Sequence, residues 1–301
     1  MSAKKKNIIG TLCCIFGATC WGFSGAFSEA LFSNYEIDST WVTSIRMLLA
    51  GIILTGIALS TKKLDVKKFL ADKTAVIQVV IFALAGLAAC QYSYLSAIMW
   101  TNSATATVLQ NLSIIFVTFY VCVSEKKIPF VSDIICVVLA TIGVWLIATG
   151  GHFGSLTLTP KGLFWGLAAG ITASSYSLLS RKPVSKLGAI PATGMGMLVG
   201  GIIFSIASRA WHVPSGLDIN AYLLLTFIVL VGTVGAFTLF LKGISMVGAI
   251  KSILLSCLEP LTATTLSIFW LHRKFSTADI VGFACILATV LISTLGKGKK
   301  Q

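Results

Sequence analysis

The stretch IRMLLAGIILTGIA, residues 45–58, decides the fold, because a similar stretch, MGMLVGGIIFSIAS, follows at residues 195–208. Both stretches are apolar, and both place two small residues at the same point, AG at 50–51 and GG at 200–201. An apolar helix of about 20 residues spans a bilayer, and small residues let two such helices approach closely. The match therefore predicts a membrane protein with an internal repeat of about 150 residues.

Two further pairs of segments have a spacing close to 150 residues. GTLCCIFGATCWGFSGAF from Gly10 is loosely similar to GLFWGLAAGITASSYSLL from Gly162, and SDIICVVLATIGVWLI at 132–147 is similar to ADIVGFACILATVLIS at 278–293. The chain therefore divides into two repeats of five helices, and we place the division after residue 150, giving 1–150 and 151–301. Because five is an odd number, the second repeat enters the membrane from the opposite side. Such inverted repeats are typical of secondary transporters.

The composition supports this interpretation. Hydrophobic residues make up 56% of the sequence and charged residues 11%, with a mean hydropathy of +0.93, whereas about 25% of the residues in soluble domains are charged. We predict an all-α integral membrane protein with ten transmembrane helices in two inverted-topology five-helix repeats. The expected spans are residues 8–32, 39–60, 74–98, 103–123, 131–150, 162–181, 190–210, 220–242, 249–271 and 278–296.

Basic residues predict the orientation. If the N-terminus is cytoplasmic, most of the 23 Lys and Arg fall in cytoplasmic segments, namely 1–7, 61–73, 124–130, 181–189 and 297–301. This bias follows the positive-inside rule and predicts a multi-pass protein of the inner or plasma membrane with both termini in the cytoplasm. The net charge of +13 is spread over these segments, so we expect membrane lipid as a partner and no nucleic acid.

No cofactor or metal site is expected. The eight Cys all fall inside expected spans without a C-x-x-C pair, which is typical of small packing residues. The chain lacks the G-x-x-x-x-G-K-[ST] loop that binds ATP. A gradient must therefore supply the energy for any transport.

Five motifs carry a resemblance to a known family. They are WGFSG at 21–25, SIRMLLAG at 44–51, SATATVLQN at 103–111, GLFWGLAAG at 162–170 and LEPLTATT at 258–265. Over essentially its whole length the chain resembles the ten-helix, EamA-like branch of the drug/metabolite transporter superfamily. The resemblance implies a central cavity surrounded by the first, third, fourth, sixth, eighth and ninth helices, and a small metabolite such as an amino acid as the substrate.

The ninth span contains the strongest single-residue signal. Glu259 is one of only 10 Asp and Glu in the chain, and an ionisable group inside the hydrocarbon region costs about 2.5–3.5 kcal/mol on insertion scales, so it usually has a function. We expect Glu259 to bind substrate and to carry the coupling proton, with a structural ion pair to Arg46 or Lys242 as the alternative. Pro260 leaves the carbonyl of Ser256 without its backbone donor, which predicts a helix kink beside the carboxylate.

Aromatic and polar residues on the cavity helices complete the predicted substrate site. Aromatic faces and side-chain hydrogen-bonding groups are the features that bind small molecules, although each such residue can also pack or bridge helices. The predicted substrate-binding residues, besides Glu259, are Trp21, Ser24, Gln91, Tyr94, Asn111, Tyr176, Phe237 and Ser256.

Other functional classes fit the sequence less well. GFSG at 22–25 matches the motif of intramembrane serine proteases, but no His lies within a span to act as the base, which such a Ser requires. Nothing resembles a selectivity filter, so a channel is disfavoured. We predict a non-enzymatic, secondary active transporter that works by alternating access, most simply a proton-linked exporter of amino acids or related metabolites. The alternative is an importer of an organic cation bound by Glu259 and aromatic residues.

Overall fold

The computed structural model describes residues 3–124, 126, 130–152 and 156–298, and within these ranges all regular structure is helical. The helices of the first half are α1 (Ala3–Asn34), α2 (Ser39–Ser60), α3 (Val66–Ala71), α4 (Lys73–Ile81), η1 (Phe82–Ala88), α5 (Ala89–Trp100), α6 (Ser103–Gln110), α7 (Ser113–Ser124) and α8 (Val131–Thr149). Those of the second half are α9 (Pro160–Leu179), α10 (Arg181–Leu187), α11 (Ala189–Ala207), α12 (Ile219–Val229), η2 (Leu230–Gly235), α13 (Ala236–Val247), α14 (Ala249–Ser256), α15 (Leu258–Phe269) and α16 (Thr277–Gly298).

The all-helical architecture is confirmed, and every predicted span is helical. Among the described residues, 8 helical segments are long and apolar enough to cross a membrane. The two predicted spans outside this set are α9 and α16, of which α16 has a shorter apolar part, Thr277–Ser293. A count of ten membrane crossings therefore stays a prediction for these two helices.

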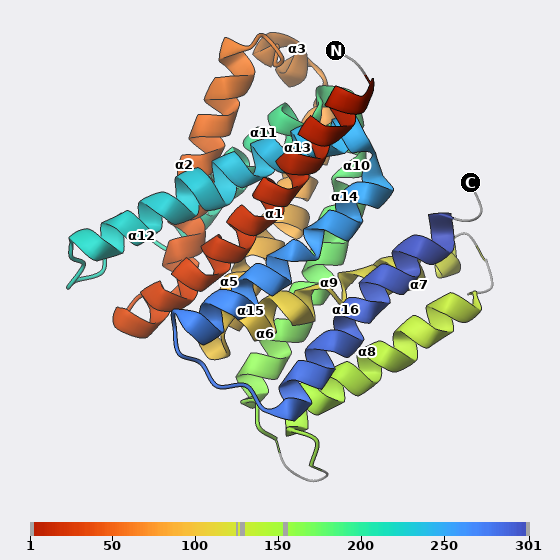
Figure 1. Ribbon diagram of the computed structural model, residues 1–301. Helices are drawn as coiled ribbons and strands as arrows, with labels where there is room; N and C mark the ends of the chain where they lie inside the picture. Colours follow the sequence, from red (N-terminus) through yellow and green to blue (C-terminus); the bar gives the residue numbers. More distant parts are fainter. Residues whose placement is uncertain (1–2, 125, 127–129, 153–155, 299–301) are drawn as a thin grey trace.

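The two halves pack together through helix pairs that are related by the repeat. α2 packs along α11, and α8 packs along α16, which lie side by side at the lower right of Figure 1. Each of these pairs joins a helix to its counterpart in the other repeat. α1 packs on α13, and α5 packs on α9. These two contacts are equivalent, because α9 is the counterpart of α1 and α13 is the counterpart of α5 in the other repeat. The core is thus arranged with the pseudo-symmetry that the repeated sequence predicts.

Small residues make these helix pairs close. A Cβ atom on Gly51 of α2 would lie 2.3 Å from the backbone N of Leu198, and one on Gly201 of α11 would lie 2.5 Å from that of Leu48. The two glycines come from the AG and GG pairs that marked the repeat in the sequence. Any side chain at either position would meet the backbone of the partner helix.

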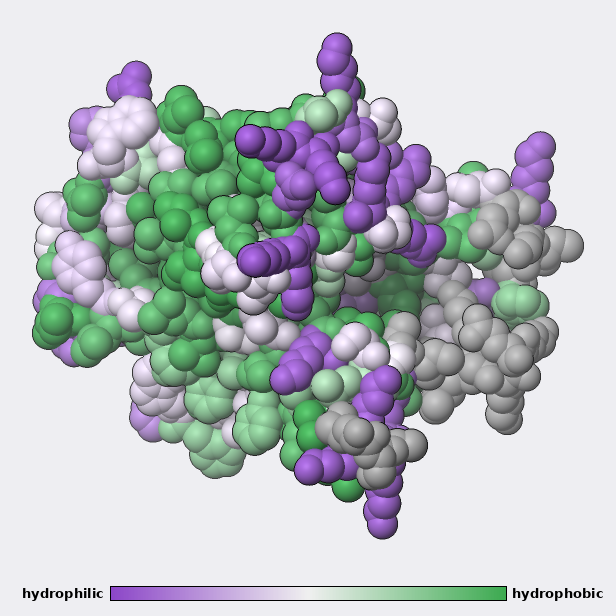
Figure 2. All heavy atoms as spheres, turned by 90° about the horizontal axis from the view of Figure 1, so that it is seen from above, coloured by the Kyte–Doolittle hydropathy of each residue, from purple (hydrophilic) through white to green (hydrophobic). Residues whose placement is uncertain are grey.

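Hydrophilic side chains gather at the end of the molecule that carries the N-terminus, α3 and α10, while hydrophobic side chains extend toward the rim (Figure 2). At this end Lys186 forms an ion pair with Asp72 across the two halves. The hydrogen bond from Lys186 holds the pKa of the Asp72 carboxyl below its usual range. The contact between α10 and the turn before α4 therefore ties the two repeats together.

The opposite end is also bridged between the halves. The hydroxyl of Tyr35 donates to Asp218 Oδ1 at 2.5 Å, and the indole N–H of Trp41 donates to the carbonyl of Ala210 at 3.0 Å. Large apolar side chains such as Phe269, which is 76% exposed, face outward, as contact with lipid requires.

Candidate functional site

Four of the predicted spans are interrupted, and the interruptions occur at corresponding points of the two repeats. The third span contains the π-helical turns of η1, and the eighth contains those of η2. The fourth span is broken between α6 and α7, and the ninth is broken at Cys257 between α14 and α15. π-helical turns and discontinuous membrane helices are frequent at functional sites, so we place the candidate site where these interruptions lie.

The WGFSG stretch of α1 lies against this region. A Cβ atom on Gly22 would be 2.7 Å from the backbone carbonyl oxygen of Glu259, and one on Gly25 would be 2.7 Å from the hydroxyl of Tyr94. Gly22 and Gly25 are three residues apart, so they lie on the same face of α1, and the absence of side chains there lets this face contact both the start of α15 and α5. The backbone of Glu259 and the hydroxyl of Tyr94 thus lie against neighbouring positions of the same helix.

Glu259 lies in the first turn of α15 and is partly exposed. It forms no hydrogen bond or ion pair with any residue that the structure describes. It interacts electrostatically with Arg46 of α2, with Cys90 and Tyr94 of α5 and with the neighbouring Cys257. A carboxylate at a helix N-terminus is stabilised by the helix dipole, and here it still has its hydrogen-bonding capacity free for a ligand.

Arg46 is deeply buried, with 4% of its surface exposed. Its Nε donates to the hydroxyl of Thr233 in η2 at 2.8 Å, and that hydroxyl donates to the carbonyl of Ile228 at 2.8 Å, five residues earlier. Thr233 therefore stabilises the π-helical turn and positions the guanidinium. The Nη1 atom of Arg46 is buried and has no hydrogen-bond partner among the described residues.

Aromatic rings form an apolar wall beside these charges. Trp21 contacts Phe237 edge-on at 5.1 Å between ring centroids and contacts Phe240 at 4.7 Å. Tyr176 of α9 stacks on Phe82 of η1 at 5.7 Å. Trp21, Tyr176 and Phe237 all belong to one hydrophobic cluster around η1 and η2, so three predicted residues are brought together.

The predicted polar residues divide into two groups. Tyr94 shares a 2.8 Å hydrogen bond with the hydroxyl of Thr107, whose backbone carbonyl accepts from the amide nitrogen of Asn111 at 2.9 Å. Tyr94 and Asn111 are thus linked through the fourth span, and Gln91 is buried on α5 one turn before Tyr94. The side chain of Ser256, in contrast, is satisfied within its own helix by the carbonyl of Ile253 at 2.8 Å.

The family assignment follows from comparison with known proteins. A model of the EamA-like transporter family matches residues 8–149 and again residues 160–295. The chain belongs to the EamA-like transporter family. It is therefore a multi-pass membrane protein built from two copies of the EamA-like repeat, and this membership points away from an enzyme.

Individual relatives agree with this assignment. The protein named Uncharacterized inner membrane transporter YicL of Salmonella typhimurium is 30% identical over 303 residues, covering 100% of this chain and 99% of its own length. The Uncharacterized transporter YwfM of Bacillus subtilis is 25% identical, covering 98% and 97%. A crystal structure of a protein with 15% identity matches the fold over 100% of both chains with a TM-score of 0.63.

The interruption of the ninth span in this EamA-like chain begins before Pro260. α14 ends at Ser256, α15 begins at Leu258, and Pro260 lies in the first turn of α15, where its missing N–H costs little. The corresponding break between α6 and α7 lies in SATATVLQNLS, which contains no proline. The break is therefore common to both EamA-like repeats, and Pro260 is compatible with it without being required for it.

Two buried charges of this EamA-like chain were not among the predicted site residues. The sequence predicts Arg46 only as a structural partner of Glu259 and does not single out Glu29, although both residues fall inside predicted spans. Glu29 is 2% exposed and accepts hydrogen bonds from the backbone N–H of Ser103 at 2.8 Å and from Arg273 Nε at 2.7 Å. The signal that could have found Glu29 is the one used for Glu259, a carboxylate within an apolar run.

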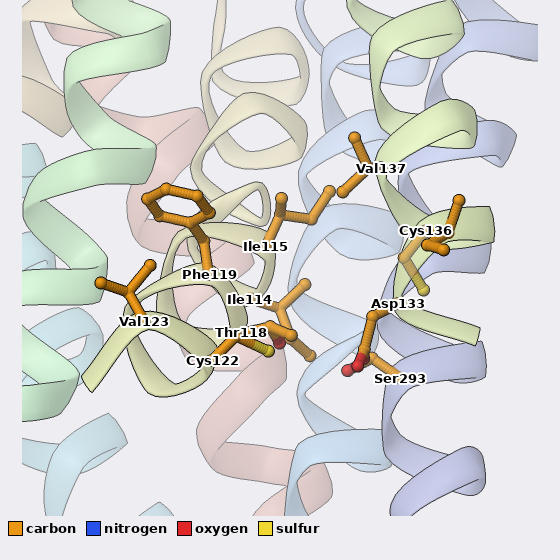
Figure 3. A pocket seen from close by; sticks show the side chains of 11 residues that line it. Ile114, Ile115, Thr118, Phe119, Cys122, Val123, Asp133, Cys136, Val137 and Ser293 are labelled. Carbon is orange, nitrogen blue, oxygen red and sulfur yellow. The ribbon is translucent and has the colours of Figure 1, made fainter. Parts of the chain in front are cut away.

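A side cavity lies apart from this site. It has a volume of about 370 Å³ and is lined by α7, α8 and α16 (Figure 3). Its walls are mostly apolar, and the carboxylate of Asp133 at its edge accepts from the backbone N–H of Phe130 at the start of α8. None of the predicted binding residues lines it. It is therefore not the candidate site.

Proposed function

We propose that this EamA-like protein is a secondary active transporter that exports amino acids or related metabolites in exchange for protons. It works by alternating access in the inner or plasma membrane, with both termini in the cytoplasm and the two repeats, 1–150 and 151–301, moving about the site between them. Glu259 carries the proton and contacts the substrate. Trp21, Tyr176 and Phe237 contact the apolar part of the substrate, and Ser24, Gln91, Tyr94, Asn111 and Ser256 supply polar groups.

The unpaired carboxylate of Glu259 carries this proposal. It lies at the start of a half-helix beside a helix break, without a hydrogen bond to any described residue, and within electrostatic range of Arg46. Such half-helix ends are where secondary transporters bind substrates and coupling ions. A carboxylate that is free to take up and release a proton suits exchange of a proton for a substrate at the same site.

Flux into proteoliposomes tests the proposal. A thermal-shift screen against amino acids, amines and nucleobases selects the substrate, and a gradient of one pH unit is then imposed without a membrane potential. One-for-one exchange of a proton for a zwitterion accumulates the substrate about tenfold on the acidic side, because one pH unit is worth about 1.4 kcal/mol.

The variant Glu259→Gln identifies the proton carrier. It keeps the size of the side chain and removes its titration, so we expect downhill exchange to persist at saturating substrate concentration while the pH gradient no longer drives accumulation. Normal pH-driven accumulation by Glu259→Gln contradicts the proton-carrier role.

The second candidate function is import of an organic cation. The cluster of Trp21, Phe237 and Phe240 beside an anionic group favours it, because aromatic faces bind cations. In the same liposomes an importer of this kind accumulates choline on the negative side of a membrane potential, and Glu259→Gln abolishes both choline binding and choline uptake. Accumulation of a zwitterion on the acidic side, without choline uptake, rejects this candidate.

A further inference from the structure

Arg46 keeps donor capacity that the fold does not use. Thr233 holds only Nε, and Nη1 is buried without a partner among the described residues. Leaving a buried donor unsatisfied costs about 1–3 kcal/mol, and more for a charged group. A guanidinium in this condition, on a helix whose other polar groups are uncharged in its central turns, is poised to bind an anion that is not part of the protein.

Glu259 does not fill this role in the structure. Arg46 and Glu259 interact electrostatically, but they do not form an ion pair, because no guanidinium nitrogen of Arg46 lies within 4.0 Å of a carboxylate oxygen of Glu259. Each charge instead keeps free hydrogen-bonding groups. One group is on α2 and the other on α15, so the two poles come from different repeats and converge on the region of Tyr94 and Cys90.

We propose that Arg46 and Glu259 form a two-pole site that selects substrates carrying both an anionic and a cationic group. Arg46 binds the substrate carboxylate through its guanidinium, and Glu259 binds the substrate ammonium. This inference rests on the proposed function and sharpens it, because it makes Arg46 a substrate-binding residue and predicts that compounds with one of the two charges are rejected.

The physical reason for this selectivity is the cost of leaving one pole empty. A cation alone pairs with Glu259 but leaves the Arg46 guanidinium buried and unpaired, and an anion alone pairs with Arg46 but leaves the Glu259 carboxylate without a partner. A site built around buried polar groups discriminates strongly against ligands that leave one of them unpaired. The apolar wall of Trp21 and Phe237 buries apolar surface of the ligand and so adds affinity to all three classes of compound.

Three matched probes test the proposal in the purified full-length protein. L-phenylalanine carries both charges, 2-phenylethylamine lacks the carboxylate, and 3-phenylpropionate lacks the ammonium, while the ring is common to all. Binding is measured by ligand-dependent thermal shift and by quenching of the intrinsic tryptophan fluorescence. In the wild type we expect L-phenylalanine to bind at least about 30-fold more tightly than either analogue. This factor is the expected effect of losing one charge-assisted hydrogen-bonded pair.

Arg46→Gln separates recognition from structure. The variant should weaken the binding of L-phenylalanine by about the same factor as removal of the carboxylate from the ligand does in the wild type. It should change the affinity for 2-phenylethylamine by less than threefold. Arg46→Lys keeps the charge and should retain part of the preference for L-phenylalanine. The control is Thr55→Val, a near-isosteric change at a buried hydroxyl farther along α2, which should leave all three affinities unchanged.

Each outcome decides for or against the two-pole site. Equal losses for L-phenylalanine and 2-phenylethylamine in Arg46→Gln mean that Arg46 is structural, and equal wild-type affinities for all three probes contradict the site even if Arg46→Gln fails to fold. The proposed function is judged separately by flux. Proton-driven transport without dependence on Arg46 refutes the two-pole site alone, whereas Arg46-dependent binding without any flux refutes the transport proposal alone.

Discussion

At the scale of single residues, an ion pair between Glu29 and Arg273 joins distant parts of the chain. Glu29 is 2% exposed, whereas the side chain of Arg273 is 45% exposed. The Glu29 carboxylate also accepts from the hydroxyls of Ser103 at 2.7 Å and Ser267 at 3.1 Å. It therefore joins α1, α6 and α15 at one buried point.

This asymmetry of burial predicts an asymmetry of mutant stability. Arg273→Met leaves a buried carboxylate without its counter-charge and should lower the free energy of unfolding by about 3 kcal/mol. Glu29→Gln leaves an arginine that water can reach and should cost only about 1 kcal/mol. Thermal unfolding of the purified variants in detergent measures both, with Ser33→Ala, which loses only a 3.2 Å hydrogen bond to Arg273, as the control. A larger loss for Glu29→Gln contradicts this account.

Glu29, Arg273 and Arg46 show which features of the site the sequence alone does not predict. A carboxylate in an apolar run identified Glu259, and composition identified the aromatic residues. The pairing of Glu29 with Arg273 joins residues 244 positions apart, and no local pattern encodes which buried charge finds a partner. The free Nη1 of Arg46 likewise depends on where Thr233 lies in η2, so its importance could be recognised only in three dimensions.

At the scale of elements, the packing of α2 against α11 depends on the glycines that marked the repeat. Gly51 faces the backbone of Leu198, whereas a Cβ atom on Gly56, five residues later on α2, would have nothing within 4 Å. Both are glycines of α2, but Gly51 faces the backbone of α11 and Gly56 faces open space.

We therefore expect the same substitution to have opposite consequences at these two glycines. Gly51→Leu should force the helices apart and abolish a monodisperse peak in size-exclusion chromatography, because overpacking at a backbone contact has no room to relax. Gly56→Leu should leave the protein intact and raise its melting temperature slightly, since a helical glycine costs about 0.5–1 kcal/mol relative to residues with better helix propensity. A stable Gly51→Leu protein contradicts the close α2–α11 contact.

Helix boundaries show where element-level prediction fails. The predicted spans 74–98 and 220–242 correspond to helical segments, but η1 and η2 within them were not anticipated. A π-helical turn requires only one extra residue, and its cause here includes tertiary contacts such as the hydrogen bond of Arg46 to Thr233. The pairs of small residues at 50–51 and 200–201, in contrast, are adjacent in the sequence, so they can be recognised without the structure.

At the scale of the whole molecule, the repeat predicted which helices would meet. Pairing of α2 with α11 and of α8 with α16 follows once two halves are related by a pseudo-twofold axis, since each of these helices then packs on its own counterpart. The sequence could not predict which contacts close the two ends. Those contacts, Asp72 with Lys186 of the short helix α10 at one end and Tyr35 with Asp218 at the other, lie in connecting segments without similarity between the repeats.

The two ends differ in charge, and this difference predicts the orientation. The segments around α3 and α10 are rich in lysine and lie at the end that carries the N-terminus (Figure 1). Retention of lysine and arginine on the cytoplasmic side during insertion should place this end inside the cell. The loop before α12, which contains the exposed Ser215, should then face outward.

Single cysteines test this orientation in a variant without the native cysteines. Lys63→Cys and Ser215→Cys both introduce a thiol at an exposed loop position, so their reactivity depends on the side of the membrane. A membrane-impermeant maleimide added to intact cells should label Ser215→Cys and should label Lys63→Cys only after the cells are permeabilised. The reverse pattern places the lysine-rich end outside and contradicts the orientation that the positive-inside rule predicts.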